Sequence, residues 1–188
     1  MTRQEVPYQP EHVRFVDQLS VTAVRSAIST SRRFLRFALA KWHADLIEDD
    51  VLLVSSELVT NAVAITGVVA EKPTWGELER LDLVHVRLVG LRDSIVIEVW
   101  DVSGEPPALK RADDDAEGGR GLFLVQRLAR RWGSFRAGGG KAVWAELAVR
   151  PPLPRRQETR HPIPRPTATA GPDAAFLRRV LTGLDTAP

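Results

Sequence analysis

Apolar residues recur at helical spacing, every three or four positions, in three parts of the chain. The predicted helices cover residues 21–42, 45–65 and 121–131. The second begins with three acidic residues, which suits the positive end of a helix dipole, and Gly67 follows its last apolar turn as a stop signal. In the first, the arginines fall mainly outside the apolar stripe, where water can solvate them.

Other stretches alternate apolar and polar residues in the two-residue period of β-strands. The predicted strands cover residues 12–19, 81–89, 94–101, 132–137 and 142–149. Asp93 lies in the short connection between the second and third of these, which predicts a hairpin.

Composition divides the chain into three parts. Residues 1–11 are polar and form an N-terminal extension, and residues 12–149 contain the helices and strands above. Residues 150–188 are rich in proline and arginine and are predicted to be a largely disordered tail, with one short helix over 173–184.

Cysteine content, the length of apolar stretches and net charge exclude several classes of function. The 188 residues include no cysteine, which excludes disulfides, thiolate metal sites and cysteine nucleophiles. No stretch approaches the roughly 20 apolar residues that span a bilayer, so we expect a cytoplasmic protein without membrane contact. Net charge is only +2, and the arginine clusters accompany no docking motif. We therefore expect no direct contact with nucleic acid.

Two polar residues, Glu57 and Asn61, lie four positions apart at the edge of the apolar face of the second predicted helix. An asparagine carbonyl can bind a hard cation such as Mg²⁺, and a glutamate can take a proton from a nearby hydroxyl. On spacing alone, an ordinary solvated helix edge is the simpler interpretation.

Asp101 ends a strand whose inward row is Ile95, Ile97 and Val99. An acid in phase with that row needs a hydrogen-bond donor, and the amino group of adenine is one. Gly104 follows, where a flat ring could approach the backbone. An acid that has left the core and caps a turn is an equally good interpretation.

Glycines at 118, 119 and 121 lead directly into the third predicted helix. Backbone amides at a glycine turn and helix start are well placed to bind phosphate oxygens. The Lys-Ser/Thr pair of a P-loop does not follow, so the stretch is not a P-loop. A flexible loop end is the alternative interpretation of these glycines.

The stretches ELVTNAV, VIEVWDVSGEPP, EGGRGLFLV and KAVWAEL together resemble the GHKL superfamily of histidine-kinase-like ATPases. Within it they look most like the serine/threonine kinases of the anti-sigma-factor type. The resemblance implies an α/β fold, a two-layer sandwich in which helices cover one face of a mixed, mostly antiparallel sheet. It also implies ATP and Mg²⁺ as ligands.

The resemblance also implies residue roles. Asn61 would bind Mg²⁺ and Glu57 would be the general base of phosphoryl transfer. Asp101 and Gly104 would bind adenine, and Gly119 and Gly121 would surround the phosphates. Residues 105–118 would form a lid, from which Lys110 and Arg111 could reach phosphate. The implied partners are a sigma factor and an antagonist protein, and such proteins commonly form homodimers.

Three positions depart from the family pattern. Ala64 and Ile65 stand where relatives often have a basic residue and a histidine, and Glu117 stands where some have a lid arginine. The alternative is therefore an ATP-sensing binding module without phosphotransfer. A detached ATPase domain of a histidine kinase is less well supported, because neither His12 nor His43 lies in a dimerisation helix with an acceptor histidine.

Overall fold

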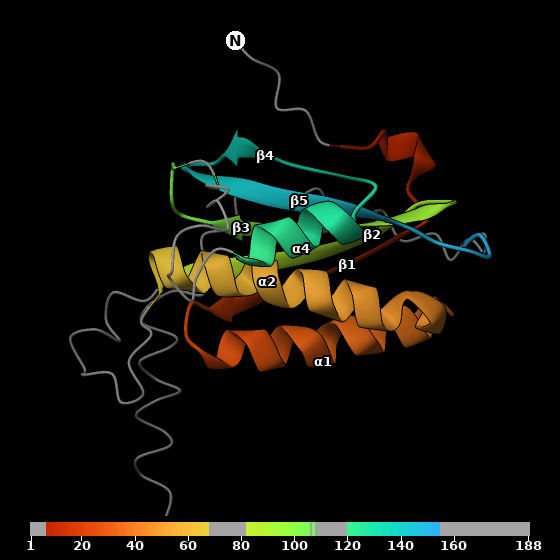
Figure 1. Ribbon diagram of the computed structural model, residues 1–188, viewed down its shortest axis with the longest axis horizontal. Coiled ribbons are helices and arrows are strands. Elements are labelled where there is room, and N and C mark those ends of the chain that lie inside the picture. Colours follow the sequence, from red (N-terminus) through yellow and green to blue (C-terminus); the bar gives the residue numbers. More distant parts are fainter. Residues whose placement is uncertain (1–6, 68–81, 106, 108–119, 155–188) are drawn as a thin grey trace, which may run out of the picture.

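Five strands form one sheet in the part of the chain that the structure describes (Figure 1). The structure is a computed structural model and describes residues 7–67, 82–105, 107 and 120–154. The strand order is β1-β2-β3-β5-β4, and every pairing is antiparallel. The strands are β1 (Phe15–Thr22), β2 (Leu83–Gly90), β3 (Ser94–Asp101), β4 (Arg131–Ala137) and β5 (Gly140–Ala148).

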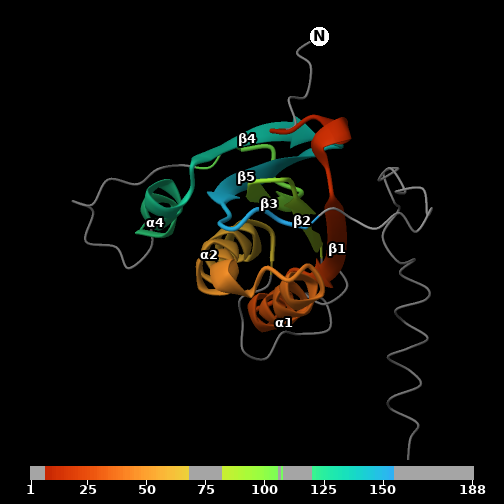
Figure 2. The ribbon, with the colours of Figure 1, turned by 90° about the vertical axis from the view of Figure 1, so that its right-hand side faces the viewer.

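Three described α-helices cover one face of this sheet (Figure 2). They are α1 (Ser26–Lys41), α2 (Glu48–Thr66) and α4 (Arg120–Leu128), and two 3-10 turns lie at Pro10–His12 (η1) and Asp45–Ile47 (η2). The two-layer α/β sandwich expected from the sequence is confirmed. The described sheet is wholly antiparallel, whereas the expected sheet was mixed and mostly antiparallel.

Strand register sets which side chains face the helices. Paired residues of antiparallel strands point to the same face, and Val99 pairs with Val143 in the core between sheet and helices. Two residues further along, Asp101 pairs with Lys141. Asp101 and Lys141 therefore lie on the helix side, at the end of the apolar rows.

The other face of the sheet is crossed by the segment before β1 (Figure 2). The Arg87 guanidinium donates to the Tyr8 hydroxyl at 2.8 Å and pairs with Glu98, which is fully buried. Burial raises the pKa of Glu98 above its usual range, and the positive charge of Arg87 opposes that shift. Burial, and then Glu98, raise the pKa of the Tyr8 hydroxyl.

The two flanks of the described chain meet at the turn between β2 and β3. The Arg14 amide donates to the Gly90 carbonyl at 2.8 Å, and the Leu153 amide donates to the Arg92 carbonyl at 2.9 Å. The Arg14 guanidinium also donates to the Leu153 carbonyl. Leu153, which follows residue 149, is buried in the core. Tyr8, which precedes residue 12, contacts Arg87 of β2. Residues on both sides of the predicted 12–149 domain therefore pack against that domain.

Some predicted boundaries were wrong. Val21 belongs to β1 and not to a helix, because it pairs with Val84, and α1 begins only at Ser26. The third helix ends at Leu128, since the Arg130 amide already bonds to the Glu146 carbonyl as the chain enters β4.

The second helix ends where the sequence predicted. Gly67 follows α2, and a β-carbon on it would overlap the Ala23 carbonyl, which explains the requirement for glycine. Ile65, the last residue of the predicted helix, is 53% exposed. The predicted helix over 173–184 lies outside the described residues.

Candidate functional site

Glu57 lies on α2 directly against the first turn of α4. Both Glu57 and Asn61, one turn further along α2, are partly exposed, as expected of residues at the edge of an apolar face. A β-carbon on Gly121 would overlap Oε2 of Glu57 and lie 3.4 Å from its Cβ. The structure thus brings together two of the three predicted site elements, which are more than 60 positions apart in sequence.

Asp101 is 7% exposed and accepts two hydrogen bonds on the same oxygen. The Lys141 ammonium donates to Oδ1 at 2.8 Å, and the Ser103 amide donates to Oδ1 at 2.8 Å. Asp101 therefore ends an inward row, as the first interpretation expected, and its carboxylate also accepts from the turn that follows β3. The second interpretation was wrong in one respect, because Asp101 caps this turn without leaving the core.

The turn of the β4–β5 hairpin packs against the end of β3 at Asp101. Its turn has Gly138 at φ 55° and Gly139 at φ 93°, the left-handed pair of a type I′ turn. A β-carbon on Gly140 would overlap the Asp101 carbonyl oxygen, so the two backbones can meet only at a glycine. A cavity of about 140 Å³ beside them is lined by Gly104, Ser134, Phe135, Arg136 and Lys141.

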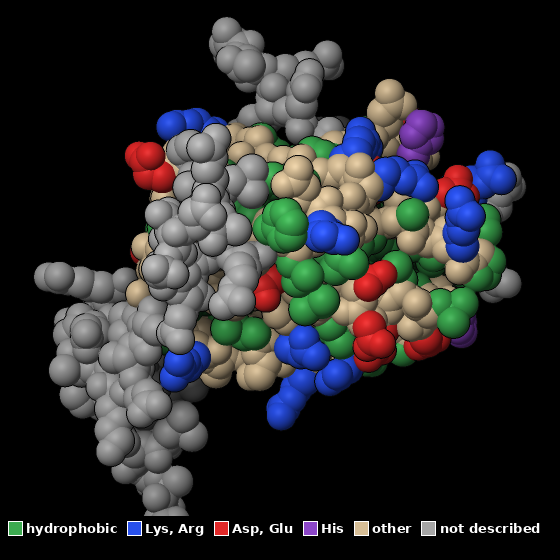
Figure 3. Space-filling view, in the orientation of Figure 1, with side chains coloured by type: hydrophobic (Ala, Val, Ile, Leu, Met, Phe, Trp, Pro, Cys, Tyr) green, Lys and Arg blue, Asp and Glu red, His purple; other side chains and the backbone are tan. Residues whose placement is uncertain are grey.

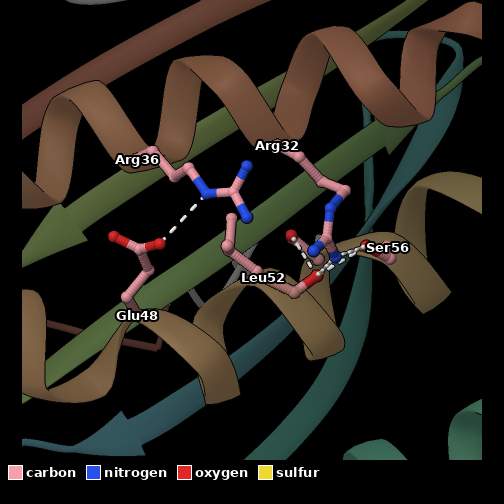
Figure 4. A network of polar contacts seen from close by, with 6 residues as sticks. Arg32, Arg36, Glu48, Leu52 and Ser56 are labelled. Carbon is pink, nitrogen blue, oxygen red and sulfur yellow. Dashed lines mark hydrogen bonds and ion pairs between the residues drawn. The ribbon is translucent and has the colours of Figure 1, made fainter.

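Helix α2 is fixed to α1 by two arginines (Figure 4). Arg32 donates to the Ser56 hydroxyl at 3.0 Å and to the Leu52 carbonyl at 3.3 Å, and Arg36 pairs with Glu48 at 3.0 Å. The sequence placed these arginines on a solvated face, but Arg32 is only partly exposed and reaches the residue before Glu57. The contacts limit the rotation of α2 and so help to orient Glu57.

Four of the predicted site elements lie wholly or mostly outside the described residues. These are Gly119, Glu117, the pair Lys110 and Arg111, and most of the segment 105–118. The structure therefore reports on the helix, strand and Gly121 parts of the site.

Comparison with protein families matches residues 19–147 to the histidine kinase-like ATPase domain. The chain belongs to this family. A comparison with curated proteins finds no match. In the described part of the chain, no helix combines the length and apolarity needed to cross a bilayer.

Membership in the histidine kinase-like ATPases implies binding of ATP, generally with Mg²⁺. The residues present fit such a ligand, because a buried carboxylate at Asp101 has one oxygen to which no described residue donates. Among the described residues, no three His, Cys, Asp or Glu side chains are grouped so that they could hold a metal ion. Magnesium is commonly held by one or two protein oxygens together with phosphates and water, which suits Asn61.

Sequence reasoning missed Lys141. The signal was present, because Lys141 is in phase with Val143, Ala145 and Leu147, the inward row of a predicted strand. A lysine in such a row requires a buried acceptor, and Asp101 already required a donor.

Proposed function

We propose that this chain is an ATP-binding regulatory protein that phosphorylates a serine or threonine of an antagonist protein, sequesters a sigma factor, or does both. The observation that carries the proposal is the contact of Glu57 with Gly121. It places a carboxylate at the start of a helix, where backbone amides bind phosphate. The family match supports ATP as the ligand, and the resemblance to anti-sigma-factor kinases supports the class of partner.

Each residue has a role in the proposed transfer. The acceptor hydroxyl oxygen attacks the γ-phosphorus, the bond to the bridging oxygen breaks, and ADP leaves with that electron pair. Glu57 accepts the hydroxyl proton and, being partly exposed, can release it to water. Asn61 would hold Mg²⁺, which neutralises phosphate charge when bound. Asp101 accepts from the adenine amino group.

Exposed apolar side chains support a protein partner. Figure 3 shows hydrophobic groups on the surface formed by α2 and α4, with basic and acidic side chains around them. Three large exposed hydrophobic residues of these helices are Leu53, Ile65 and Phe123, which are 40%, 53% and 57% exposed. Exposed groups of this kind, rimmed by charges, are typical of protein–protein contact sites.

A second candidate is an ATP-sensing module that binds a partner without phosphotransfer. The observation that favours it is the surface at the end of α2. Ala64 and Ile65, where relatives often carry a basic residue and a histidine, are both exposed and carry no charge. Both side chains could pack against a partner protein, but neither could neutralise the negative charge of a phosphate group.

Nucleotide titration tests the proposal. Calorimetry should show ATP binding that Mg²⁺ strengthens, and Asp101→Asn should weaken it by about 10-fold or more, as loss of a charged hydrogen bond does. Purine riboside triphosphate, which lacks the amino group, should bind both proteins equally. Failure to bind ATP at millimolar concentration would contradict the proposal.

Capture experiments separate the two candidates. The chain immobilised with Mg-ATP is used to collect proteins from a native extract, and the collected proteins are then incubated with γ-labelled ATP. Label on a serine or threonine of a captured protein supports the kinase. Nucleotide-dependent capture without labelling supports the binding module.

A further inference from the structure

Lys141 is a buried ammonium group with few partners. Its side chain is 3% exposed, and among the described residues its one acceptor is Oδ1 of Asp101. A lysine ammonium has three hydrogens to donate and accepts none. Leaving buried donors unpaired costs free energy, so two N–H groups of Lys141 require acceptors that the described protein does not supply.

Asp101 and Lys141 together present one acceptor beside one donor. Both described hydrogen bonds to Asp101 go to Oδ1, which leaves Oδ2 as the acceptor. The cavity lined by Lys141 and Gly104 lies next to them. Ser134 and Arg136, which also line it, pair with Val143 and Lys141 and so share the helix side of the sheet.

We propose that Lys141 contacts the nucleobase and determines its identity: the ammonium donates to a ring nitrogen of adenine next to the amino group, while Asp101 Oδ2 accepts from that amino group. This inference rests on the proposed function, because it assumes that the ligand is a purine nucleotide. In this proposal the nucleobase has two protein contacts, Asp101 and Lys141, and the Lys141 ammonium binds the ligand directly.

The order of donor and acceptor makes the pair selective. Adenine carries an amino donor beside an unprotonated ring nitrogen, which is the complement of a carboxylate beside an ammonium. Guanine in the same orientation would bring its carbonyl oxygen, an acceptor, against Asp101. Sites built to hydrogen-bond one group reject analogues that leave buried partners unpaired.

A structural role for Lys141 makes a different prediction. If the ammonium only neutralised Asp101, it would stabilise the fold and the orientation of the carboxylate. Removing a ring nitrogen from the ligand would then have no effect on affinity. The ring-nitrogen analogues of ATP therefore distinguish the two roles in the unmodified protein.

The experiment measures affinities of the full chain for ATP, 1-deaza-ATP and 7-deaza-ATP by calorimetry. We expect one of the two analogues to bind about 10-fold more weakly than ATP, consistent with loss of a hydrogen bond to a charged group. In Lys141→Met, ATP itself should weaken by about the same factor, and the penalty for that analogue should disappear. Lys41→Met removes an exposed lysine paired with Asp17 and is the matched control, with no change expected.

Two results would overturn the inference. Equal affinity of the wild-type chain for ATP and both analogues overturns it while the proposed function stands. No binding of ATP at all overturns both. If Lys141→Met does not fold because Asp101 loses its partner, the wild-type analogue series decides alone, and Lys141→Arg should retain a measurable analogue penalty.

Discussion

The Glu57 side chain on α2 lies against Gly121 in the first turn of α4, so closely that a β-carbon at position 121 would overlap the Glu57 carboxylate where it now stands. The contact joins the proposed proton acceptor to the helix start that is proposed to bind phosphate. Any change in how α4 sits on α2 therefore moves the carboxylate relative to the phosphate. One substitution on each side of this contact tests the proposed arrangement.

Replacing Glu57 by glutamine should abolish phosphotransfer and leave ATP binding nearly intact. The amide keeps the size of the side chain but cannot take the proton, and loss of a general base costs about 10²- to 10⁴-fold. Transfer to the captured partner and calorimetric affinity for ATP are the measurements. Asp49→Asn, an exposed change on the same helix, is the control. If Glu57→Gln still transferred phosphate, Glu57 would not be the general base.

Gly121→Ala should reduce phosphotransfer with little loss of stability. The new methyl group overlaps the end of a flexible side chain, so the Glu57 carboxylate can swing away at a cost below about 1 kcal/mol. Displacement of a catalytic group by about 1 Å can cost 100-fold in rate. Gln126→Ala, an exposed substitution on α4, should change neither quantity. An unchanged transfer rate in Gly121→Ala would show that catalysis does not depend on the present placement of the Glu57 carboxylate.

Two neighbouring glycines should respond differently to alanine. At Gly139 the space is open and only the positive φ of 93° opposes a side chain, which costs about 1 kcal/mol. At Gly140 the new β-carbon would overlap the backbone carbonyl of Asp101 and lie 2.9 Å from Val102 Cα. Forced repacking of that kind costs about 1–3 kcal/mol, and it also displaces Asp101. Urea unfolding should therefore rank Gly140→Ala as the more damaging, and the reverse order would contradict the contact.

Glu98 should make the protein less stable as the pH rises above the usual carboxyl range. Its pKa is higher in the folded chain than in the unfolded one, so the folded state binds the proton more tightly. Its contribution is present at low pH and is lost as the pH passes through the raised pKa, by at most about 1.4 kcal/mol per pH unit.

Glu98→Gln tests this sign. The difference in unfolding free energy between variant and wild type should move in favour of the variant as pH increases across that window. The trend with pH is the readout, because Arg87 loses its anionic partner and shifts the absolute value. Asp93→Asn, on an exposed turn, gives the comparison. A difference independent of pH would show that Glu98 does not titrate in this way.

The sequence predicted the helix edge and the strand end of the site because each is a local pattern. Glu57 and Asn61 share a helix side by spacing alone, and the inward phase of Asp101 follows from the two-residue period. Both placements are confirmed. The catalytic and ligand-binding roles of these residues stay predictions.

The rest depended on packing between distant segments. The Glu57–Gly121 contact requires α4 to lie across α2, and no period in the sequence specifies that crossing. Pairing of Lys141 with Asp101 requires β5 to lie beside β3 in one register. The start of the first helix was placed too early because Val21 fits a helical stripe as well as a strand, and pairing with β2 decides between them.

The meeting of Arg14 and Leu153 at one turn of the sheet permits a rearrangement of chain order. A short linker between these flanks could close the backbone, since the Arg14 guanidinium already bonds to the Leu153 carbonyl. New ends could then be opened at the exposed Gly138–Gly139 turn. Circular permutants are tolerated at such exposed turns. A reporter group attached to one of the new ends would lie near Asp101, and no strand would be interrupted.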